Sequence, residues 1–157
     1  MKKQLVIIGI AALLVCVGLL SGCTTPIHKT MPEYIDEVSA YKEGTDGVKI
    51  YFILKDINEY ETAYDGHVSM TIETSTDTPI VLYRTSLTVI ADDFQQTTRG
   101  IGAFNRDALI YEFPRISYSS FLVQPSSEIS YANVKITFTT PEGKILNGED
   151  SLYLLGS

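Results

Sequence analysis

The stretch YANVKITFT, from Tyr131 to Thr139, alternates apolar and polar residues over its whole length. Successive side chains of a β-strand point to opposite faces of a sheet, so this alternation predicts a strand with one buried face. A shift of one residue would bury Lys135 and Asn133, which leaves a single favourable inward face. The residues predicted to face the core are Ala132, Val134, Ile136 and Phe138.

The same period of two residues recurs on the N-terminal side of this stretch. It is clear over residues 48–55 and 67–73, and each segment is predicted to be a half-buried strand. Weaker patterns predict strands over residues 35–41, 80–90, 108–113 and 151–154. Residues typical of turns separate these segments. The turn signals are Asp46-Gly47, Asp65-Gly66, Thr78-Pro79, Pro141-Glu142-Gly143 and Asn147-Gly148.

About seven short strands with turns between them predict an all-β fold, and an antiparallel β-sandwich in particular. A small β-barrel is the alternative. Two segments, DGHVSMTI over residues 65–72 and ITFTTPEGK over residues 136–144, resemble the immunoglobulin-like modules of prokaryotic, especially archaeal, surface lipoproteins. The resemblance implies an immunoglobulin-like sandwich, although the chain has no tryptophan and no cysteine pair to join two sheets.

The N-terminus has the layout of an export signal. Lys2 and Lys3 precede sixteen uncharged residues, 5–20, and we expect a signal helix in this segment. Sixteen residues are short for a membrane span, which needs about 20, so a single transmembrane anchor is the alternative. The residues Leu20-Ser21-Gly22-Cys23 resemble the lipobox of prokaryotic lipoproteins. That resemblance implies cleavage before Cys23 and attachment of lipid to its thiol.

These features predict three parts: a signal peptide over 1–22, a lipidated cysteine and linker over 23–33, and a β-sandwich domain over 34–157. The linker residues 24–32 contain two prolines and show no apolar period, and at about 3.6 Å per residue they would reach roughly 30 Å. The protein is therefore expected at the outer face of the cytoplasmic membrane, held by lipid. With Cys16 removed and Cys23 acylated, no disulfide is expected.

The charge of the chain argues against nucleic acid as a partner. Removal of Lys2 and Lys3 leaves ten basic and nineteen acidic residues, a net charge of −9. A surface of this sign repels phosphates. The acidic residues are concentrated in the first half of the mature chain, with eleven Asp or Glu against four Lys over residues 24–77.

Residues 56–66 are the segment richest in oxygen ligands. Calcium binds six to eight such oxygens, so Asp56, Asn58, Glu61 and Asp65 are candidate ligands. The segment lacks the glycine and glutamate that an EF-hand loop carries at its sixth and twelfth positions, and a solvated loop is the favoured interpretation. A zinc site is not expected, because His67 is the one histidine on a predicted strand. No cofactor is predicted.

The same segment carries Tyr60 and Tyr64 with few apolar neighbours. Exposed tyrosines are favoured at binding surfaces, so both are candidate contacts for an unidentified protein partner. No nucleophile motif of the Gly-x-Ser-x-Gly type occurs. The sequence therefore predicts a non-enzymatic binding or structural module, with an accessory subunit of a membrane-associated enzyme or transport complex as the alternative.

Overall fold

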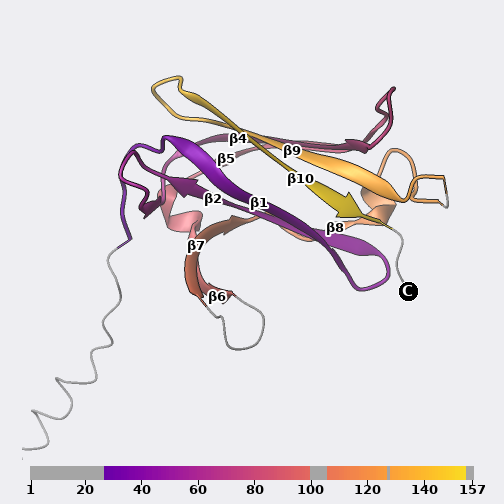
Figure 1. Cartoon of the computed structure of the whole chain (residues 1–157), viewed down its shortest axis with the longest axis horizontal. Coiled ribbons are helices and arrows are strands. Elements are labelled where there is room, and N and C mark those ends of the chain that lie inside the picture. The colour runs from indigo at the N-terminus through magenta and orange to yellow at the C-terminus, as the bar shows by residue number, and fades with distance from the viewer. Residues whose placement is uncertain (1–26, 100–105, 127, 155–157) are drawn as a thin grey trace, which may run out of the picture.

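Two antiparallel β-sheets pack face to face in this protein (Figure 1). The computed structural model describes residues 27–99, 106–126 and 128–154. The expected signal helix over 1–22 and the lipidation site Cys23 lie outside the described residues. Across the described ranges, no helix has the length and apolar content needed to cross a bilayer.

The first sheet has the order β1-β2-β7-β6, with two short strands, β3 and β8, also paired with β2. The second sheet has the order β10-β9-β4-β5. The strands of the first sheet are β1 (Tyr34–Glu43), β2 (Gly47–Lys55), β3 (Glu61–Thr62), β6 (Gln95–Arg99), β7 (Arg106–Glu112) and β8 (Ile116–Ser117). Those of the second are β4 (Gly66–Thr74), β5 (Val81–Val89), β9 (Tyr131–Thr139) and β10 (Ile145–Tyr153). Two single 3-10 turns, η1 (Ala91–Asp93) and η2 (Tyr118–Ser120), complete the described elements.

The core lies between the two sheets, and the predicted orientation of β9 is confirmed. Its four inward residues are buried, and Phe138 is fully so. Phe52 of β2 meets Phe138 across the interface, with ring centroids 6.0 Å apart. Further aromatic rings, of Phe94, Tyr111 and Phe113, surround Phe52 within the same cluster. The all-β class and the two-layer architecture predicted from alternation are thus observed.

The prediction that residues 48–55 have one buried face is wrong. In β2 the outward residues Tyr51 and Ile53 are also buried, and they pack with Ala108 and Ile110 of β7 in a second, smaller cluster. The strand lies inside its sheet, between β1 and β7, so neighbouring side chains shield both of its faces.

The predicted turn at Asn147-Gly148 is also wrong, because both residues lie inside β10. A Cβ atom on Gly148 would lie 2.7 Å from Val38 and 2.8 Å from Ile35, both in β1. The glycine therefore allows close packing of two strands instead of a reversal of the chain. The strand predicted over 151–154 consequently begins six residues earlier, at Ile145.

Three strands, β3, β6 and β8, were not expected from the sequence. The sequence of β6, QQTTR, has no apolar residue, so it lacks any alternation. It is a strand because it pairs with β7 over five residue pairs. The strands β3 and β8 have two residues each, too few to show a period.

The part of the expected linker that the structure describes, residues 27–33, lies against the sandwich. The carbonyl of His28 accepts the N–H of Ala63 at 2.9 Å, and the N–H of Thr30 donates to the hydroxyl of Thr62 at 3.0 Å. The N–H of Glu33 donates to the carbonyl of Lys55 at 2.7 Å. Within the described residues the chain is therefore already packed against the sheets at His28, six residues ahead of the predicted boundary at residue 34.

Candidate functional site

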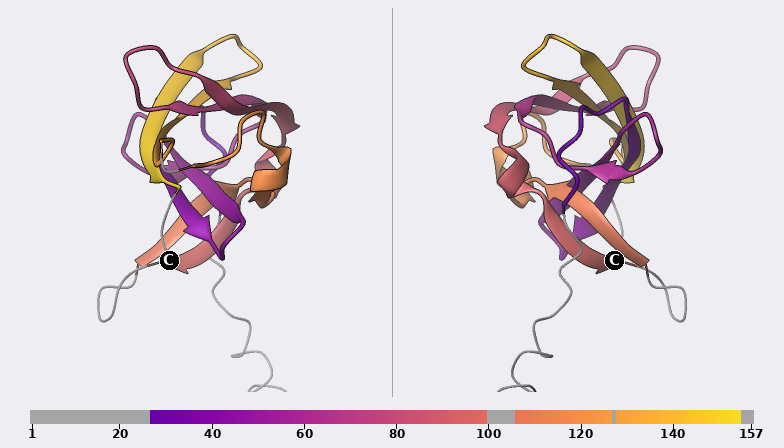
Figure 2. Two further views of the ribbon diagram at one scale, coloured as in Figure 1. Left: turned by 90° about the vertical axis from the view of Figure 1, so that its right-hand side faces the viewer. Right: turned by 90° about the vertical axis from the view of Figure 1, so that its left-hand side faces the viewer.

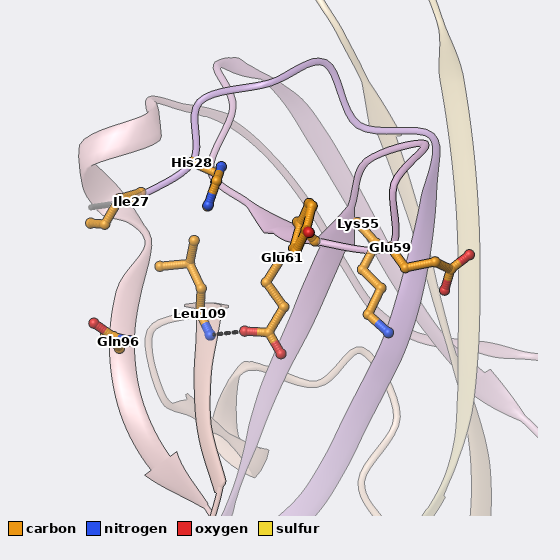
Figure 3. A pocket seen from close by; sticks show the side chains of 8 residues that line it. Ile27, His28, Lys55, Glu59, Glu61, Gln96 and Leu109 are labelled. Carbon is orange, nitrogen blue, oxygen red and sulfur yellow. Dashed lines mark hydrogen bonds between the residues drawn. The ribbon is translucent and has the colours of Figure 1, made fainter. Parts of the chain in front are cut away.

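An open cavity of about 410 Å³ lies where residues 27–28 meet the first sheet (Figure 3). Its walls come from three separate parts of the chain: residues 27–28, the end of β2 with the loop that follows, and the β6–β7 pair. The lining residues are Ile27, His28, Lys55, Glu59, Tyr60, Glu61, Gln96 and Leu109. We call this cavity the tether pocket.

Asp56 shapes the loop that forms one wall of the tether pocket. The residue is 3% exposed, and one carboxylate oxygen accepts the N–H groups of Asn58 and Tyr60 at 2.8 and 3.1 Å. The other oxygen accepts the hydroxyl of Thr30 at 2.8 Å. Burial by itself would raise the pKa of Asp56, but these hydrogen bonds outweigh it and hold the pKa below its ordinary value.

Glu59 completes this tight loop with a left-handed backbone, φ 67°. Its carboxylate accepts the hydroxyl of Tyr34 at 2.6 Å. That hydrogen bond, together with burial, raises the pKa of Tyr34 to about 12. The loop is thus tied to β1 on one side and, through Asp56, to residue 30 on the other.

Tyr60 forms an aromatic wall with His28. The two rings are stacked, with centroids 5.4 Å apart and planes at 7°. Tyr60 nevertheless stays 58% exposed. The predicted exposure of this tyrosine is therefore observed, and its stacking partner comes from the segment expected to be a linker.

Two further lining residues, Glu61 and Leu109, join β3 to β7. A carboxylate oxygen of Glu61 accepts the N–H of Leu109 at 2.6 Å, as the dashed line in Figure 3 shows. Lys55, at the edge of the pocket, forms an ion pair with Asp36 at 3.1 Å. The charged groups around the pocket are thus held in place by partners within the domain.

The chemistry of the tether pocket suits a ligand with an apolar face and polar edges. Its volume is in the range of about 300 to 1,000 Å³ that is common for ligand sites. Aromatic and aliphatic groups from Tyr60, His28, Ile27 and Leu109 lie beside the amide of Gln96 and the carboxylate of Glu61. The apolar groups can contact the apolar face of a ligand, and the amide and carboxylate can form hydrogen bonds with its polar edges.

The candidate calcium ligands serve other contacts in the structure. Asp56 and Glu61 accept the hydrogen bonds described above, and Asp65 accepts the N–H of Ala91 at 2.7 Å. Asn58 donates its backbone N–H to Asp56. Over residues 27–99, 106–126 and 128–154, no group of three His, Cys, Asp or Glu side chains is arranged to hold a metal ion.

Tyr64, the second candidate for partner contact, differs from Tyr60. It is half-buried and packs against the core, and its hydroxyl donates to Glu142 at 2.9 Å. This hydrogen bond and burial raise the pKa of Tyr64. Tyr64 therefore ties residues 62–66 to the turn between β9 and β10, and only Tyr60 presents most of its ring to solvent.

A serine and a histidine meet on the outer face of the second sheet. The hydroxyl oxygen of Ser86 lies 2.6 Å from Nε2 of His67, and both residues are exposed. The contact follows from the pairing of β4 with β5. Among the described residues, no carboxylate is hydrogen-bonded to this imidazole, so the pair lacks the third member of a catalytic triad.

No protein-family model matches the sequence, and no curated protein is significantly similar to it. Sequence reasoning found Tyr60 but missed His28, Gln96 and Leu109. No pattern near these three residues indicates that they would meet, because residues 28, 60, 96 and 109 are distant in the chain.

Proposed function

We propose that this protein is a lipid-anchored module at the outer face of the cytoplasmic membrane, and that it binds a partner without catalysing a reaction. We propose further that its two-sheet domain is an immunoglobulin-like sandwich. The sequence Leu20-Ser21-Gly22-Cys23 supports the anchor. The tether pocket supports the binding role.

The observation that carries the binding role is the exposed ring of Tyr60, stacked on His28 at the edge of an open cavity. Tyrosine offers a large contact area at a small cost in side-chain entropy. The loop beneath it is already ordered by Asp56, so little further ordering is required when a partner binds. A protein partner that covers Tyr60 and fills the pocket is the simplest occupant.

The binding role is tested by Tyr60→Ser in the full-length chain, with Tyr153→Ser as the matched control. Tyr153 is also exposed, at 49%, but it lies on β10 beside Tyr131. After cross-linking in native membranes, we expect recovery of the partner to fall about tenfold for Tyr60→Ser, as for a modest hot spot of about 1.4 kcal/mol. Equal recovery from both variants would contradict the role of the pocket.

The anchor is tested separately by Cys23→Ser. Loss of the thiol should abolish lipid labelling and release the protein from membranes or leave its signal uncleaved. Intact mass and sedimentation with membranes measure both effects. Membrane retention with unchanged mass would favour a helical anchor over a lipid.

A further inference from the structure

At one end of the sandwich, several turns contact residues 28–33. Lys29 forms an ion pair with Asp92 of η1 at 2.6 Å, and Lys144, after the β9–β10 turn, forms one with Glu33. The loop that follows β2 is hydrogen-bonded to Thr30 through Asp56. Three turns therefore meet the chain where it enters the domain, and the right-hand view of Figure 2 looks onto this end.

Each of these three turns exposes an isoleucine. Ile57, in the loop after β2, is 78% exposed. Ile145, at the start of β10, is 61% exposed, and Ile90, before η1, is 51% exposed. We call this end, defined by Ile57, Ile90 and Ile145, the isoleucine end.

Few residues separate the proposed lipidation site, Cys23, from the first described residue, Ile27. Four residue steps separate Cys23 from Ile27, and at about 3.6 Å each they span at most roughly 14 Å. A nine-residue strand such as β9 is about 30 Å long. The distance from a lipid on Cys23 to the start of the domain would therefore be shorter than the sandwich is long. Such a lipid would keep the isoleucine end near the bilayer.

We propose that the isoleucine end rests on the bilayer and that Ile57, Ile90 and Ile145 enter the layer of lipid headgroups. This inference rests on the proposed lipid anchor. Apolar side chains that lie in the interface contribute binding in proportion to the area that they bury. The contact holds the sandwich end-on, with the β4–β5 turn and residues 118–124 directed away from the membrane.

The charges at this end favour a surface of zwitterionic lipid. Glu33 and Asp92 are paired with the two lysines described above, yet their side chains remain 52% and 76% exposed. Asp93 and Glu142 lie nearby, beside Asp92 and Lys144 in the chain, and both are exposed. Acidic residues thus outnumber basic ones here, so anionic headgroups would be repelled. The apolar contact, in contrast, is not weakened when salt screens the charges.

The chain contains no tryptophan, so a single introduced tryptophan reports its own surroundings. The test compares Ile57→Trp with Leu122→Trp in the acylated protein, reconstituted into phosphatidylcholine vesicles with brominated acyl chains. Leu122 is 69% exposed and lies after η2, so it is a control of similar exposure. We expect blue-shifted emission and about twofold quenching for Ile57→Trp alone, because interfacial side chains lie about 5 to 10 Å deep.

Three other outcomes would overturn the inference, and each has a different cause. If the protein stays with the vesicles and neither tryptophan is quenched, the domain stands off the membrane although the anchor is correct. Equal quenching of both variants would mean that the sandwich lies on its side. If intact mass shows no lipid on Cys23, the proposed anchor fails, and with it the tether length on which the inference depends.

Discussion

At the scale of single residues, Asp56 is the clearest case of one side chain that organises a site. Its two carboxylate oxygens accept three hydrogen bonds, which join residue 30 to the loop that carries Tyr60. In sequence it is one acidic residue among several in residues 56–66. Its burial, at 3% exposed, separates it from those neighbours.

The lowered pKa of Asp56 predicts how stability depends on pH. Between the folded pKa and the ordinary value of 3.8, the unfolded state binds more protons than the folded state. The contribution of Asp56 to the free energy of unfolding should therefore be complete above about pH 5 and should be lost as the pH drops through the folded pKa. In Asp56→Asn, the free energy of unfolding measured with denaturant should decrease less steeply as the pH is lowered.

The control for this measurement is Asp77→Asn, which removes the same charge from an exposed residue between β4 and β5. Glu142, whose pKa is also lowered, first by its own backbone N–H and then by Thr140 and Tyr64, remains in every variant. If the free energy of unfolding of Asp56→Asn decreases with pH as steeply as that of the unchanged protein, Asp56 does not contribute to the pH dependence of stability.

Phe138 tests the orientation of β9. Its side chain is fully buried against Phe52, so Phe138→Ala should lower the free energy of unfolding by about 3 to 5 kcal/mol. Thr137 points outward and donates its hydroxyl to Asn147 at 2.9 Å, so Thr137→Ala should change stability by no more than about 1 kcal/mol. Urea denaturation measures both, and similar losses at the two positions would refute the inward face assigned here.

At the scale of elements, β10 shows how packing overrides a local signal. An Asn-Gly pair is typical of a tight turn, yet Asn147 and Gly148 pair with Thr137 and Ile136 inside an antiparallel ladder. The same strand packs beside β1, and the N–H of Ala40 donates to Asp150 at 2.8 Å. Gly148 provides the space that this approach requires.

Gly148→Ala should therefore weaken the contact between β1 and β10. The added methyl group would meet Val38 and Ile35, and such overpacking costs about 1 to 3 kcal/mol. Hydrogen exchange at the Ala40 amide should become faster, because its acceptor Asp150 is on the displaced strand. Ser151→Ala, on the exposed face of β10, should stay within about 0.5 kcal/mol, and equal effects of the two changes would argue against close packing here.

At the scale of the whole molecule, the tether pocket exists because segments far apart in the chain meet at one end of the sandwich. Residues 27–28 bring His28 to Tyr60, and the β6–β7 pair brings Gln96 and Leu109 to the same cavity. This is also the end that exposes Ile57, Ile90 and Ile145 and at which the chain enters the domain. The pocket is therefore adjacent to the end that we propose contacts the membrane, and under that proposal a ligand of the pocket would be bound close to the bilayer.

The sequence by itself determined the all-β class, most strand positions and the inward face of β9. These features depend on alternation within a few residues, and alternation follows directly from the geometry of an extended backbone. The sequence also predicted that Tyr60 is exposed, because few neighbouring residues in the chain are apolar and could cover its ring.

Only the tertiary structure decided the second buried face of β2, the strand at Gly148, the docking of residues 27–33 and the composition of the tether pocket. Each depends on contacts between residues that are far apart in sequence, such as His28 with Tyr60 or Gly148 with Val38. A local pattern reports which side of a strand is apolar. Which distant segment covers that side is determined by the packing of the whole chain.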